Sequence, residues 1–391
     1  MKTLFLYEYK PHCPWIGDFR SLEVLVQGLK KLGHEALISN DPNQIDFFDT
    51  IVLSNISTDL TPLEQILHIK NRPFSLIPFH EDFLLYTSIY RSFFAYVANA
   101  LISDNPHEAI HFLEYMPDIL YYEPFAPKRN ALINQSVMAK AEICIANSPS
   151  EEKLIQRSCP LAKTSTIFWT SGYVEKDAYR YSAKFIKRFN LPKKGYILQI
   201  GRIGPRKNQL ATILAARDLE LPLVFVATGH FPLENEYLNT CLLAAKKFRK
   251  GPTLFLTNAV EEMKENNIEV INVKEGLTTQ ELMSAYQNAA VYCHPAFYEL
   301  PGYVYLEAAK LGTPCVASSW STLKDYFTET MTGSYTLDNR IEYILPYDLK
   351  AIKTAILNSL DKSFSPSNHP IFQRTDLDVA KEFLGVMSDS L

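Results

Sequence analysis

The sequence predicts a two-domain α/β protein in which each domain is a doubly wound parallel sheet covered by helices. Three observations support this prediction: a length of 391 residues, short apolar runs that alternate with helical patterns, and a polar stretch that divides the chain. At roughly 150 residues per domain, the length allows two or three domains with cores of their own. Alternating apolar strands and helices are typical of parallel sheets.

Strand and helix signals alternate along the first half of the chain. An apolar run at residues 3–7 is followed by a helical pattern of leucine and valine residues that ends at Gly33, a residue type that often terminates helices. Extended patterns recur after it. We expect strands at residues 3–7, 34–39, 50–53, 74–79 and 143–146.

A second cycle of the same kind follows a polar stretch. We expect its strands at residues 196–200, 223–227, 268–271, 290–293 and 314–317, with a helix at 279–288. The predicted organisation is an N-terminal domain (1–175), a linker (176–194), a C-terminal domain (195–369) and a last helix that crosses back to the first domain (370–391). Ligands of this fold class bind at the carboxyl ends of the strands, here in a cleft between the domains.

Composition and charge exclude several classes of protein. A formal net charge of −4 provides no general attraction for nucleic acid or an anionic membrane. Residues 1–175 hold 14 basic and 20 acidic side chains, and the remainder holds 25 and 23, so the second half is the better host for a phosphate. The most apolar segment, 83–102, contains Arg91 and Asn99 and falls short of a transmembrane helix. Six scattered cysteines predict a cytoplasmic protein, with peripheral attachment to a membrane left open.

A loop rich in cations follows the expected strand at 196–200. Residues 201–207 (GRIGPRK) combine turn-forming residues with three positive side chains. Arginine offers a fixed fork of donors and lysine a mobile charge, a combination suited to the two phosphates of a diphosphate. The pattern matches neither the dinucleotide-binding motif nor the P-loop. The alternative interpretation is an exposed basic turn without a ligand.

Two glutamates follow the expected strand at 290–293. Glu299 precedes a helix that we expect to start near Gly302, and Glu307 lies within that helix, off its apolar stripe. Amides at a helix start can receive a phosphate, and a carboxylate can accept hydrogen bonds from two neighbouring hydroxyls. We therefore expect both glutamates to be accessible to a ligand that is part diphosphate and part sugar. The alternative is a loop glutamate and a solvated helix glutamate.

These residues resemble the donor-binding half of the retaining GT-B glycosyltransferases of family 4. The resemblance rests on Gly201-Arg202 followed by Lys207, on Glu299 and Glu307 in an E-x7-E arrangement, and on residues 312–318. Residues 31–35 and 141–148 are similar to the first domain of that family. The match covers most of the chain and is more specific in the second half.

The resemblance implies the GT-B fold and a retaining, metal-independent transfer of a hexose-type sugar from a nucleotide-sugar donor, such as a UDP- or GDP-sugar, to a glycan, lipid or protein acceptor. No other cofactor is implied. Arg202 and Lys207 would neutralise the diphosphate, Glu307 would hold the ribose, and residues 273–277 would contact the base. The implied catalytic residues are Glu299, Arg202, Lys207 and His80. The implied donor-binding residues are Gly17, Gly201, Arg202, Lys207, Gly276, Leu277, Glu299, Leu300, Pro301, Gly302, Tyr303 and Glu307.

The first domain contributes fewer candidates. Its first loop has only Gly17 where the family usually has a glycine pair, and this glycine could let the backbone approach the donor phosphate. Asp18 and Asp82 are acceptor candidates. His80, at the end of the strand at 74–79, would contact donor sugar or acceptor; the alternative is a loop histidine bonded to a neighbour. The aromatic-rich stretch 83–125 predicts helix packing rather than an acceptor platform.

A metal-binding motif is spelled near the C-terminus but is better explained as a helix cap. Asp376 and Asp378 form a D-x-D sequence, like that of metal-dependent glycosyltransferases. They lie where Thr375 or Asp376 would cap a helix over 379–386. We interpret the motif as a cap and expect no metal site.

Two other functions remain open at this point. A sugar phosphorylase of similar fold would use similar cations to bind inorganic phosphate. A non-catalytic sugar-nucleotide-binding or scaffold protein belongs to a different class, and the intact set of Arg202, Lys207 and Glu299 argues against it.

Overall fold

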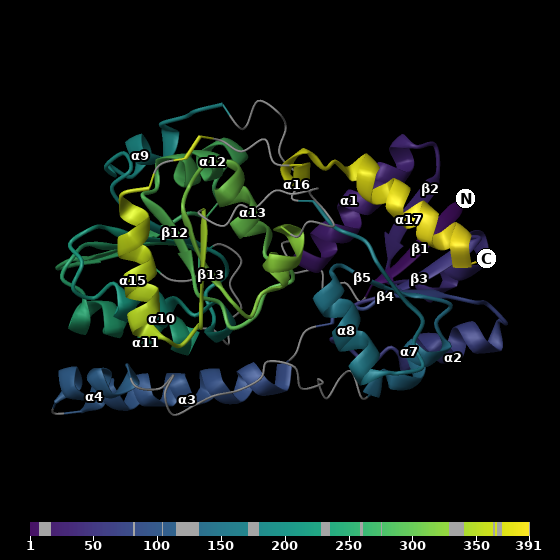
Figure 1. Ribbon diagram of the computed structural model, residues 1–391, viewed down its shortest axis with the longest axis horizontal. Coiled ribbons are helices and arrows are strands. Elements are labelled where there is room, and N and C mark those ends of the chain that lie inside the picture. Colours follow the sequence, from purple (N-terminus) through teal and green to yellow (C-terminus); the bar gives the residue numbers. More distant parts are fainter. Residues whose placement is uncertain are drawn as a thin grey trace.

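The computed structural model describes most of the 391-residue chain. The described residues are 1–7, 17–80, 83–103, 105–114, 133–170, 180–227, 235–258, 261–274, 276–327, 340–362, 364–365 and 370–390. They form two sheets with helices packed around them, one in each half of the chain, and the two halves lie side by side (Figure 1). The prediction of an α/β fold with two Rossmann-like halves is confirmed. The exact domain boundaries stay a prediction.

The first sheet has six described strands in the order β2-β1-β3-β4-β5-β6, all of them paired in parallel. Leu4 and Leu6 pack on one face of it and Phe5 on the other, and all three are fully buried. Burial on both faces explains why the first strand reads as a continuous apolar run. The strands are β1 (Lys2–Tyr7), β2 (Glu35–Ser39), β3 (Thr50–Ser54), β4 (Ser75–Ile77), β5 (Cys144–Ala146) and β6 (Thr164–Thr166).

The second sheet has eight described strands in the order β10-β11-β9-β8-β7-β12-β13-β14. Its pairs are parallel except β10 with β11, which form an antiparallel hairpin at one edge. The strands are β7 (Ile197–Ile200), β8 (Leu223–Ala227), β9 (Thr253–Thr257), β10 (Met263–Glu265), β11 (Ile268–Asn272), β12 (Val291–His294), β13 (Cys315–Ser318) and β14 (Ile341–Ile344).

Helices of ordinary length connect the strands. Those of the first half are α1 (Gly17–Lys31), α2 (Thr61–Ile69), α3 (Phe83–Ile102), α4 (Pro106–Leu113), α7 (Gln135–Lys140), α8 (Pro149–Ser158) and the 3-10 helix η1 (Pro42–Phe47). Those of the second half are α9 (Lys184–Arg188), α10 (Gln209–Ala215), α11 (Asn235–Phe248), α12 (Thr279–Asn288), α13 (Tyr303–Lys310), α15 (Leu349–Leu360), α16 (Pro370–Gln373), α17 (Asp376–Ser390) and the 3-10 helices η3 (Pro205–Lys207) and η5 (Thr322–Phe327).

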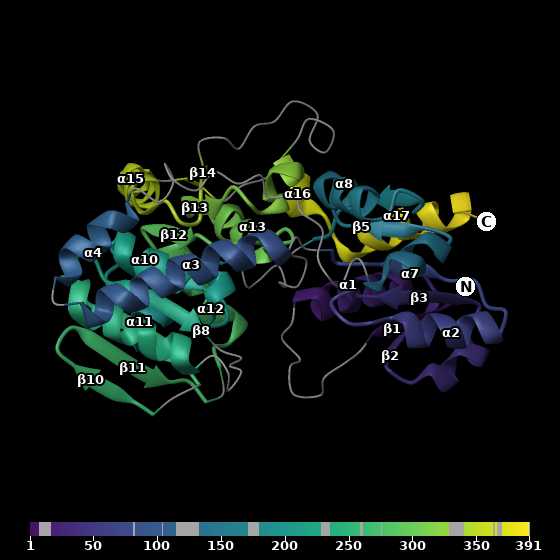
Figure 2. The ribbon, with the colours of Figure 1, turned by 90° about the horizontal axis from the view of Figure 1, so that it is seen from below.

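The helices α3 and α4 leave the first half of the chain and pack against the second half. The ring centroid of Phe93 lies 6.3 Å from that of Phe297, and the ring of Phe94 lies 5.9 Å from that of Tyr237. Figures 1 and 2 show α3 running along the helices of the second sheet. Phe93 and Phe94 therefore pack in a core, as expected of this segment, but the core belongs to the other half of the chain, which the sequence did not predict.

The C-terminal helix α17 lies on α1 in the first half. Val379 and Phe383 are fully buried in the core that contains the face of α1. A Cβ at Gly28 would lie 2.1 Å from the carbonyl oxygen of Asp376, so only glycine permits this close approach. Thr375 and Asp378 form a mutual cap at the start of the helix, with an N–O distance of 2.8 Å from Thr375 N to Asp378 Oδ2. The side chains of the D-x-D motif thus serve the helix and its contact with α1.

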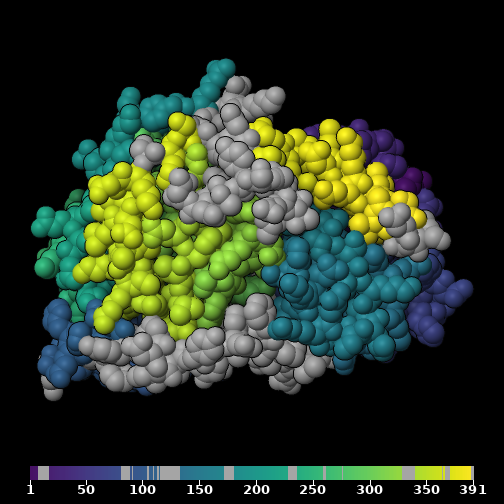
Figure 3. Space-filling model, in the orientation of Figure 1, coloured from purple at the N-terminus to yellow at the C-terminus, as the bar shows by residue number. Residues whose placement is uncertain are grey.

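Polar contacts join the two halves near α8 and η5. Ser150 donates to Asp325 through its backbone N–H (2.8 Å) and its hydroxyl (3.0 Å). The Tyr326 hydroxyl donates to the carbonyl oxygen of Asn147 at 3.0 Å. Figure 3 shows the surface of α8 against that of the second half, with the yellow C-terminal segment extending over both halves. These contacts position the carboxyl ends of the two sheets relative to each other.

Candidate active site

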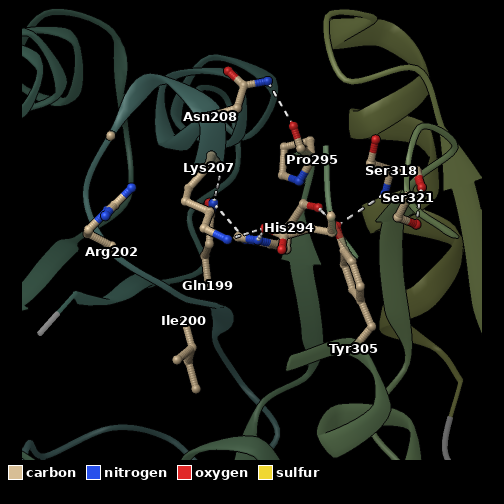
Figure 4. Close-up of polar contacts among 12 residues, drawn as sticks. Gln199, Ile200, Arg202, Lys207, Asn208, His294, Pro295, Tyr305, Ser318 and Ser321 are labelled. Atoms are coloured by element: carbon tan, nitrogen blue, oxygen red, sulfur yellow. Dashed lines mark hydrogen bonds and ion pairs between the residues drawn. The ribbon is translucent and has the colours of Figure 1, made fainter. Parts of the chain in front are cut away.

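The loop after β7 brings the predicted cations to the carboxyl end of that strand. Gly201 has φ of +151°, and a Cβ there would lie 3.3 Å from the ring of His294, so a side chain would displace its neighbour. Asn208, in the left-handed conformation at the start of α10, donates through Nδ2 to the carbonyl oxygens of Pro295 (2.9 Å) and Pro346 (2.6 Å). These bonds hold the cation loop beside the loop that follows β12 (Figure 4).

Lys207, His294 and Glu299 meet at the carboxyl ends of β7 and β12. Lys207 Nζ forms an ion pair with Oε1 of Glu299, and Nε2 of His294 lies 3.1 Å from the same oxygen. Figure 4 shows Lys207 and His294 converging, with Arg202 on the loop that carries Lys207. The structure therefore brings two predicted catalytic residues into contact. It corrects one expectation, because Glu299 is 6% exposed and not an accessible loop residue.

The charges in this cluster change the pKa values of its members. Burial alone would raise the pKa of Glu299, but the charge of Lys207, the hydrogen bond from His294 and the charge of Arg206 hold that pKa well below its ordinary value of 4.5. Burial lowers the pKa of Lys207 more than Glu299 raises it, and Arg206 and Arg202 lower it further. Burial also lowers the pKa of His294. At neutral pH the cluster therefore contains an ionised carboxylate and a neutral imidazole.

Gly302 and Tyr305 fix the start of α13 next to Glu299. Gly302 has φ of +85°, and a Cβ there would lie 2.7 Å from the ring of Tyr305. The Tyr305 hydroxyl donates to the carbonyl oxygen of His294 at 2.5 Å, which ties the helix to the end of β12. Thr322 N donates to the carbonyl oxygen of Glu299 at 3.1 Å. The amides that the sequence predicts as phosphate ligands therefore adjoin the buried carboxylate.

Glu307 is also buried, but its partners differ. Its Oε2 accepts a hydrogen bond from the Tyr286 hydroxyl at 2.9 Å, and its Oε1 lies 3.7 Å from a guanidinium nitrogen of Arg20. Burial raises the pKa of Glu307, and the charge of Arg20 opposes that shift. The side chain is 3% exposed, so the expectation of an open helix glutamate was wrong. Residues on α12 and on α1 fill the space that a solvated side chain would occupy.

The start of α1 faces the start of α13 across the two halves. The hydroxyls of Ser21 and Tyr303 are 2.6 Å apart, and Ser21 also donates to the carbonyl oxygen of Gly17 at 3.1 Å. Asp18 accepts a hydrogen bond from Asn55 at 3.1 Å. The structure therefore brings the predicted Gly17 and Asp18 close to the predicted Tyr303.

His80 lies apart from the cluster around Glu299 in its described contacts. It is fully buried, its Nε2 lies 2.8 Å from the hydroxyl of Ser158, and its backbone N–H donates to Glu151. Both contacts belong to α8 of the first domain. A role for His80 toward donor or acceptor stays a prediction. Asp82 falls outside the described residues.

The stretch predicted to contact the base lines a pocket of about 530 Å³. Gly276 has φ of +73°, and its N–H donates to the carbonyl oxygen of Val273 at 2.8 Å. Thr278 and Glu281 form a capping box at the start of α12. The pocket is lined by Arg188, Glu262, Asn272, Val273, Lys274, Gly276, Leu277, Thr278 and Glu281. The remaining predicted donor residues, Leu300 and Pro301, lie between Glu299 and α13, with Leu300 half-buried and Pro301 buried.

Three site residues were missed by the sequence analysis. His294 opens the glutamate-containing segment but received no role, although a histidine that ends an apolar strand was a usable signal. Gln199 is the one polar residue in the apolar run 196–200 apart from the hydroxyl of Tyr196, and it bonds to His294 at 3.1 Å. Arg20 reaches Glu307 from another domain, and nothing in the sequence pattern indicates that contact.

The described residues show neither a metal-binding cluster nor a membrane-spanning helix. No group of three or more histidine, cysteine, aspartate or glutamate side chains is arranged there to hold a metal ion. No described helix combines the length and the apolar character needed to cross a membrane.

Comparison with known proteins identifies the class. Residues 182–345 match the family described as "Glycosyl transferases group 1", a segment that contains Arg202, Lys207, Glu299 and Glu307. No curated protein matches the sequence. The matched segment spans the cation loop and the E-x7-E arrangement, so the family and the motifs point to the same residues.

The fold of the whole chain is similar to that of solved sugar-phosphate synthases. The sucrose-phosphate synthase of Thermosynechococcus elongatus has 15% sequence identity and a TM-score of 0.62, with 99% of this chain and 94% of that chain covered. A UDP-forming α,α-trehalose-phosphate synthase of Burkholderia xenovorans has 12% identity and a TM-score of 0.52, with 94% and 78% covered. At such identities the likeness shows the fold alone. The match over residues 182–345 and the likeness of the fold are both consistent with a GT-B glycosyltransferase of group 1.

Proposed function

We propose that this glycosyltransferase moves a hexose-type sugar from a nucleotide-sugar donor to an acceptor, with retention at the anomeric carbon and without a metal ion. One observation carries the proposal. The ionised Glu299 is held by Lys207 and His294 at the strand ends, next to the cation loop and the start of α13. This arrangement combines positive charge for a diphosphate with a carboxylate for sugar hydroxyls.

The donor diphosphate would lie against Arg202, Lys207 and the amides at the start of α13. An ammonium group has three N–H donors, so Lys207 retains two for phosphate while it is paired with Glu299. The ionised carboxylate accepts hydrogen bonds from sugar hydroxyls and cannot donate one. Glu307 would accept the hydroxyls of the ribose. The pocket at residues 272–278 is proposed for the base.

The same cations explain how the reaction proceeds without a divalent ion. The bond between the anomeric carbon and the diphosphate oxygen breaks, and the diphosphate keeps the electron pair. The acceptor hydroxyl oxygen forms the new bond to that carbon and gives its proton to the departing diphosphate oxygen. Arg202 and Lys207 stabilise the negative charge that develops on the leaving phosphate, a contribution on the order of 3 kcal/mol per group. Retention is proposed from the group 1 family and the E-x7-E arrangement.

The contact between α1 and α13 supports a site that closes around the donor. Ser21 and Tyr303 are hydrogen-bonded across the two halves, beside the proposed phosphate site. Closure of this kind excludes water, which would otherwise hydrolyse the donor. The acceptor candidates Asp18 and His80 come from the first half, which is therefore proposed to bind the acceptor.

Sugar phosphates are the first acceptors to test, ahead of other glycans, lipids and proteins. The similar solved structures are named sucrose-phosphate and trehalose-phosphate synthases, the latter described as UDP-forming. These names are the reason to test UDP-sugars first as donors and hexose phosphates first as acceptors. The scattered cysteines support a reducing compartment, for which we propose the cytoplasm.

A binding screen followed by a transfer assay tests this function. A nucleotide that binds only the native state raises its melting temperature, so UDP, GDP and ADP are compared by thermal shift, each with and without its sugar. The stabilising donor is then incubated with hexose phosphates, with EDTA present, and the product anomer is assigned by NMR. We expect one nucleotide series to stabilise the protein and transfer to persist in EDTA with retained configuration. Sugar release that needs inorganic phosphate and no nucleotide would instead establish a phosphorylase.

A further inference from the structure

A chain of buried hydrogen bonds runs behind the Glu299 carboxylate. Thr212 Oγ1 donates to Oε1 of Gln199 at 2.6 Å. Nε2 of Gln199 contacts the carbonyl oxygen of Lys207 at 2.7 Å and Nδ1 of His294 at 3.1 Å. Thr212 and His294 are fully buried and Gln199 is 1% exposed, so water cannot substitute for these partners.

This chain determines which nitrogen of His294 carries the proton. The carbonyl oxygen of Lys207 can only accept a hydrogen bond, so it must face the amide nitrogen of Gln199. The second hydrogen of that nitrogen points to Nδ1 of His294, which therefore accepts. In a neutral imidazole the remaining hydrogen is then on Nε2. That nitrogen lies 3.1 Å from Glu299 Oε1 and donates to it.

The donation from His294 leaves one oxygen of Glu299 for another partner. Both Lys207 and His294 contact Oε1. Among the described residues, no hydrogen bond to Oε2 of Glu299 is found. The backbone of Glu299 is held as well, through its carbonyl oxygen and Thr322 N. Glu299 is thus held at its backbone carbonyl and at Oε1. Among the described contacts, Oε2 is the carboxylate oxygen that remains for a ligand.

We propose that Gln199 and His294 are positioning residues of the transfer reaction. Gln199 supports the ring of His294 at Nδ1, and His294 in turn fixes Glu299 so that Oε2 meets a hydroxyl of the donor sugar. Neither residue touches the donor itself. This inference rests on the proposed function, since it assigns the partner of Glu299 Oε2.

A matched pair of substitutions separates positioning from a purely structural role. His294→Gln keeps an N–H donor near the place of Nε2, whereas His294→Asn keeps polarity near Nδ1 but cannot reach Glu299. We expect His294→Asn to lower kcat by about tenfold or more and His294→Gln to stay within about threefold of the wild type. Both variants should bind the nucleoside diphosphate that lacks the donor sugar with an affinity within about twofold of the wild type. Equal loss in the two variants, or loss in neither, would overturn the positioning role.

The tautomer is measured independently of activity. The chain has nine histidines; with ¹⁵N-labelled histidine, the ring signals of His294 are assigned by their absence in His294→Gln. We expect an unprotonated Nδ1 and a protonated Nε2 at pH 7. Gln199→Met has a similar shape and no N–H donor. The proton should stay on Nε2, because the ionised Glu299 can only accept, but the ring loses its support at Nδ1 and kcat should fall by about tenfold. Gln199→Glu should place a proton on both nitrogens, because each ring nitrogen then faces a carboxylate.

The outcomes distinguish the inference from the function on which it rests. A wild-type imidazole protonated on Nδ1, or on both nitrogens, would overturn the inference while the transfer assay could still succeed. The expected tautomer in a protein that transfers no sugar would refute the proposed function, and the positioning role with it. The expected tautomer and kcat loss in Gln199→Met would support both.

Discussion

Glu299 and Glu307 lie eight positions apart and are both buried, but the regions around them differ. Glu299 is paired with Lys207 and His294, which belong to the same half of the chain. Glu307 receives a hydrogen bond from Tyr286 and has its cation, Arg20, in the other half. The pKa is lowered for Glu299 and raised for Glu307.

The difference shows that burial alone does not decide the charge of a carboxylate. Both side chains lose water, and the number and closeness of the cations then determine the direction of the pKa. Because Lys207 and His294, the partners of Glu299, lie in the same half of the chain as Glu299, its site is formed whatever the position of the first half. The surroundings of Glu307 depend on how the two halves are placed. We therefore expect the sugar site to be preformed and the ribose site to respond to domain arrangement.

The largest effect is expected from removal of the charge at Glu299. Glu299→Gln keeps the shape but loses the ion pair with Lys207 and the charge that orients the sugar. We expect kcat/KM to fall about 100- to 1,000-fold, by analogy with the loss of other preorganised electrostatic groups. Steady-state transfer assays measure this. Glu269→Gln, at a surface strand position, is the control and should stay near wild type; a Glu299→Gln variant with normal turnover would remove the residue from the mechanism.

The next effect concerns the free energy of unfolding. Its dependence on pH has opposite signs at Glu299 and at Glu307. The lowered pKa of Glu299 contributes stability that is present above its ordinary pKa of 4.5 and is lost as pH falls through the folded-state value. Glu299→Gln should therefore cost about 3 kcal/mol at pH 7, because Lys207 loses its buried partner, and less near pH 4. The raised pKa of Glu307 contributes stability that is lost as pH rises.

Urea unfolding of both variants between pH 4 and pH 8 measures this contrast. Glu307→Gln should be within about 1 kcal/mol of the wild type at pH 7, because it replaces a carboxylate that burial already disfavours in the charged form. If the free energies of unfolding of the two variants changed with pH in the same way, the two carboxylates would have equivalent surroundings. That result would contradict the contrast between Glu299 and Glu307.

A smaller effect is expected on nucleotide affinity at Glu307. The glutamine in Glu307→Gln accepts only through one oxygen, so one hydrogen bond to the ribose is weakened. We expect affinity for the nucleoside diphosphate to fall about 5- to 10-fold, or about 1 kcal/mol, by titration calorimetry. A nucleoside diphosphate that lacks both the 2′- and the 3′-hydroxyl should bind the wild type and Glu307→Gln with equal affinity. A full retention of ribose discrimination in Glu307→Gln would place the ribose elsewhere.

The smallest effect is expected at the pair that joins the halves. Arg20 is partly exposed, so its ion pair with Glu307 is weak. Arg20→Met should leave nucleotide affinity within about twofold at pH 8, with a difference that grows as pH falls, because Glu307 without this cation protonates more easily. Lys30→Met, on the same helix, should show no such pH dependence, and an identical profile in both variants would remove Arg20 from the site.

The sequence predicted those features that depend on local pattern. Most buried strands read as apolar runs, and the cation loop and the helix start at Gly302 follow from turn-forming residues. Lys207 and Glu299 could therefore each be placed after the end of a strand, although the pairing of those two strands was not predicted. The strands β6, β9, β10 and β14 were not predicted. The residues of β6, Thr164–Thr166, are polar and lie at the sheet edge, whereas those of β9, Thr253–Thr257, are buried and were missed despite their apolar character.

Features that depend on contacts between distant segments could not be predicted. The packing of Phe93 on Phe297 and the pairing of Arg20 with Glu307 arise only when the two halves meet. A single sequence carries no signal for such pairings, since an amphipathic helix can bury its apolar face on either domain.

The central claim is that Arg202 and Lys207 bind a nucleotide through its second phosphate. Calorimetric affinities of the stabilising nucleoside diphosphate and of its monophosphate test this in the wild type, Arg202→Ala and Lys207→Met. We predict a preference of tenfold or more for the diphosphate in the wild type, reduced to about twofold in each variant while monophosphate affinity changes little. An undiminished preference in both variants would contradict the account.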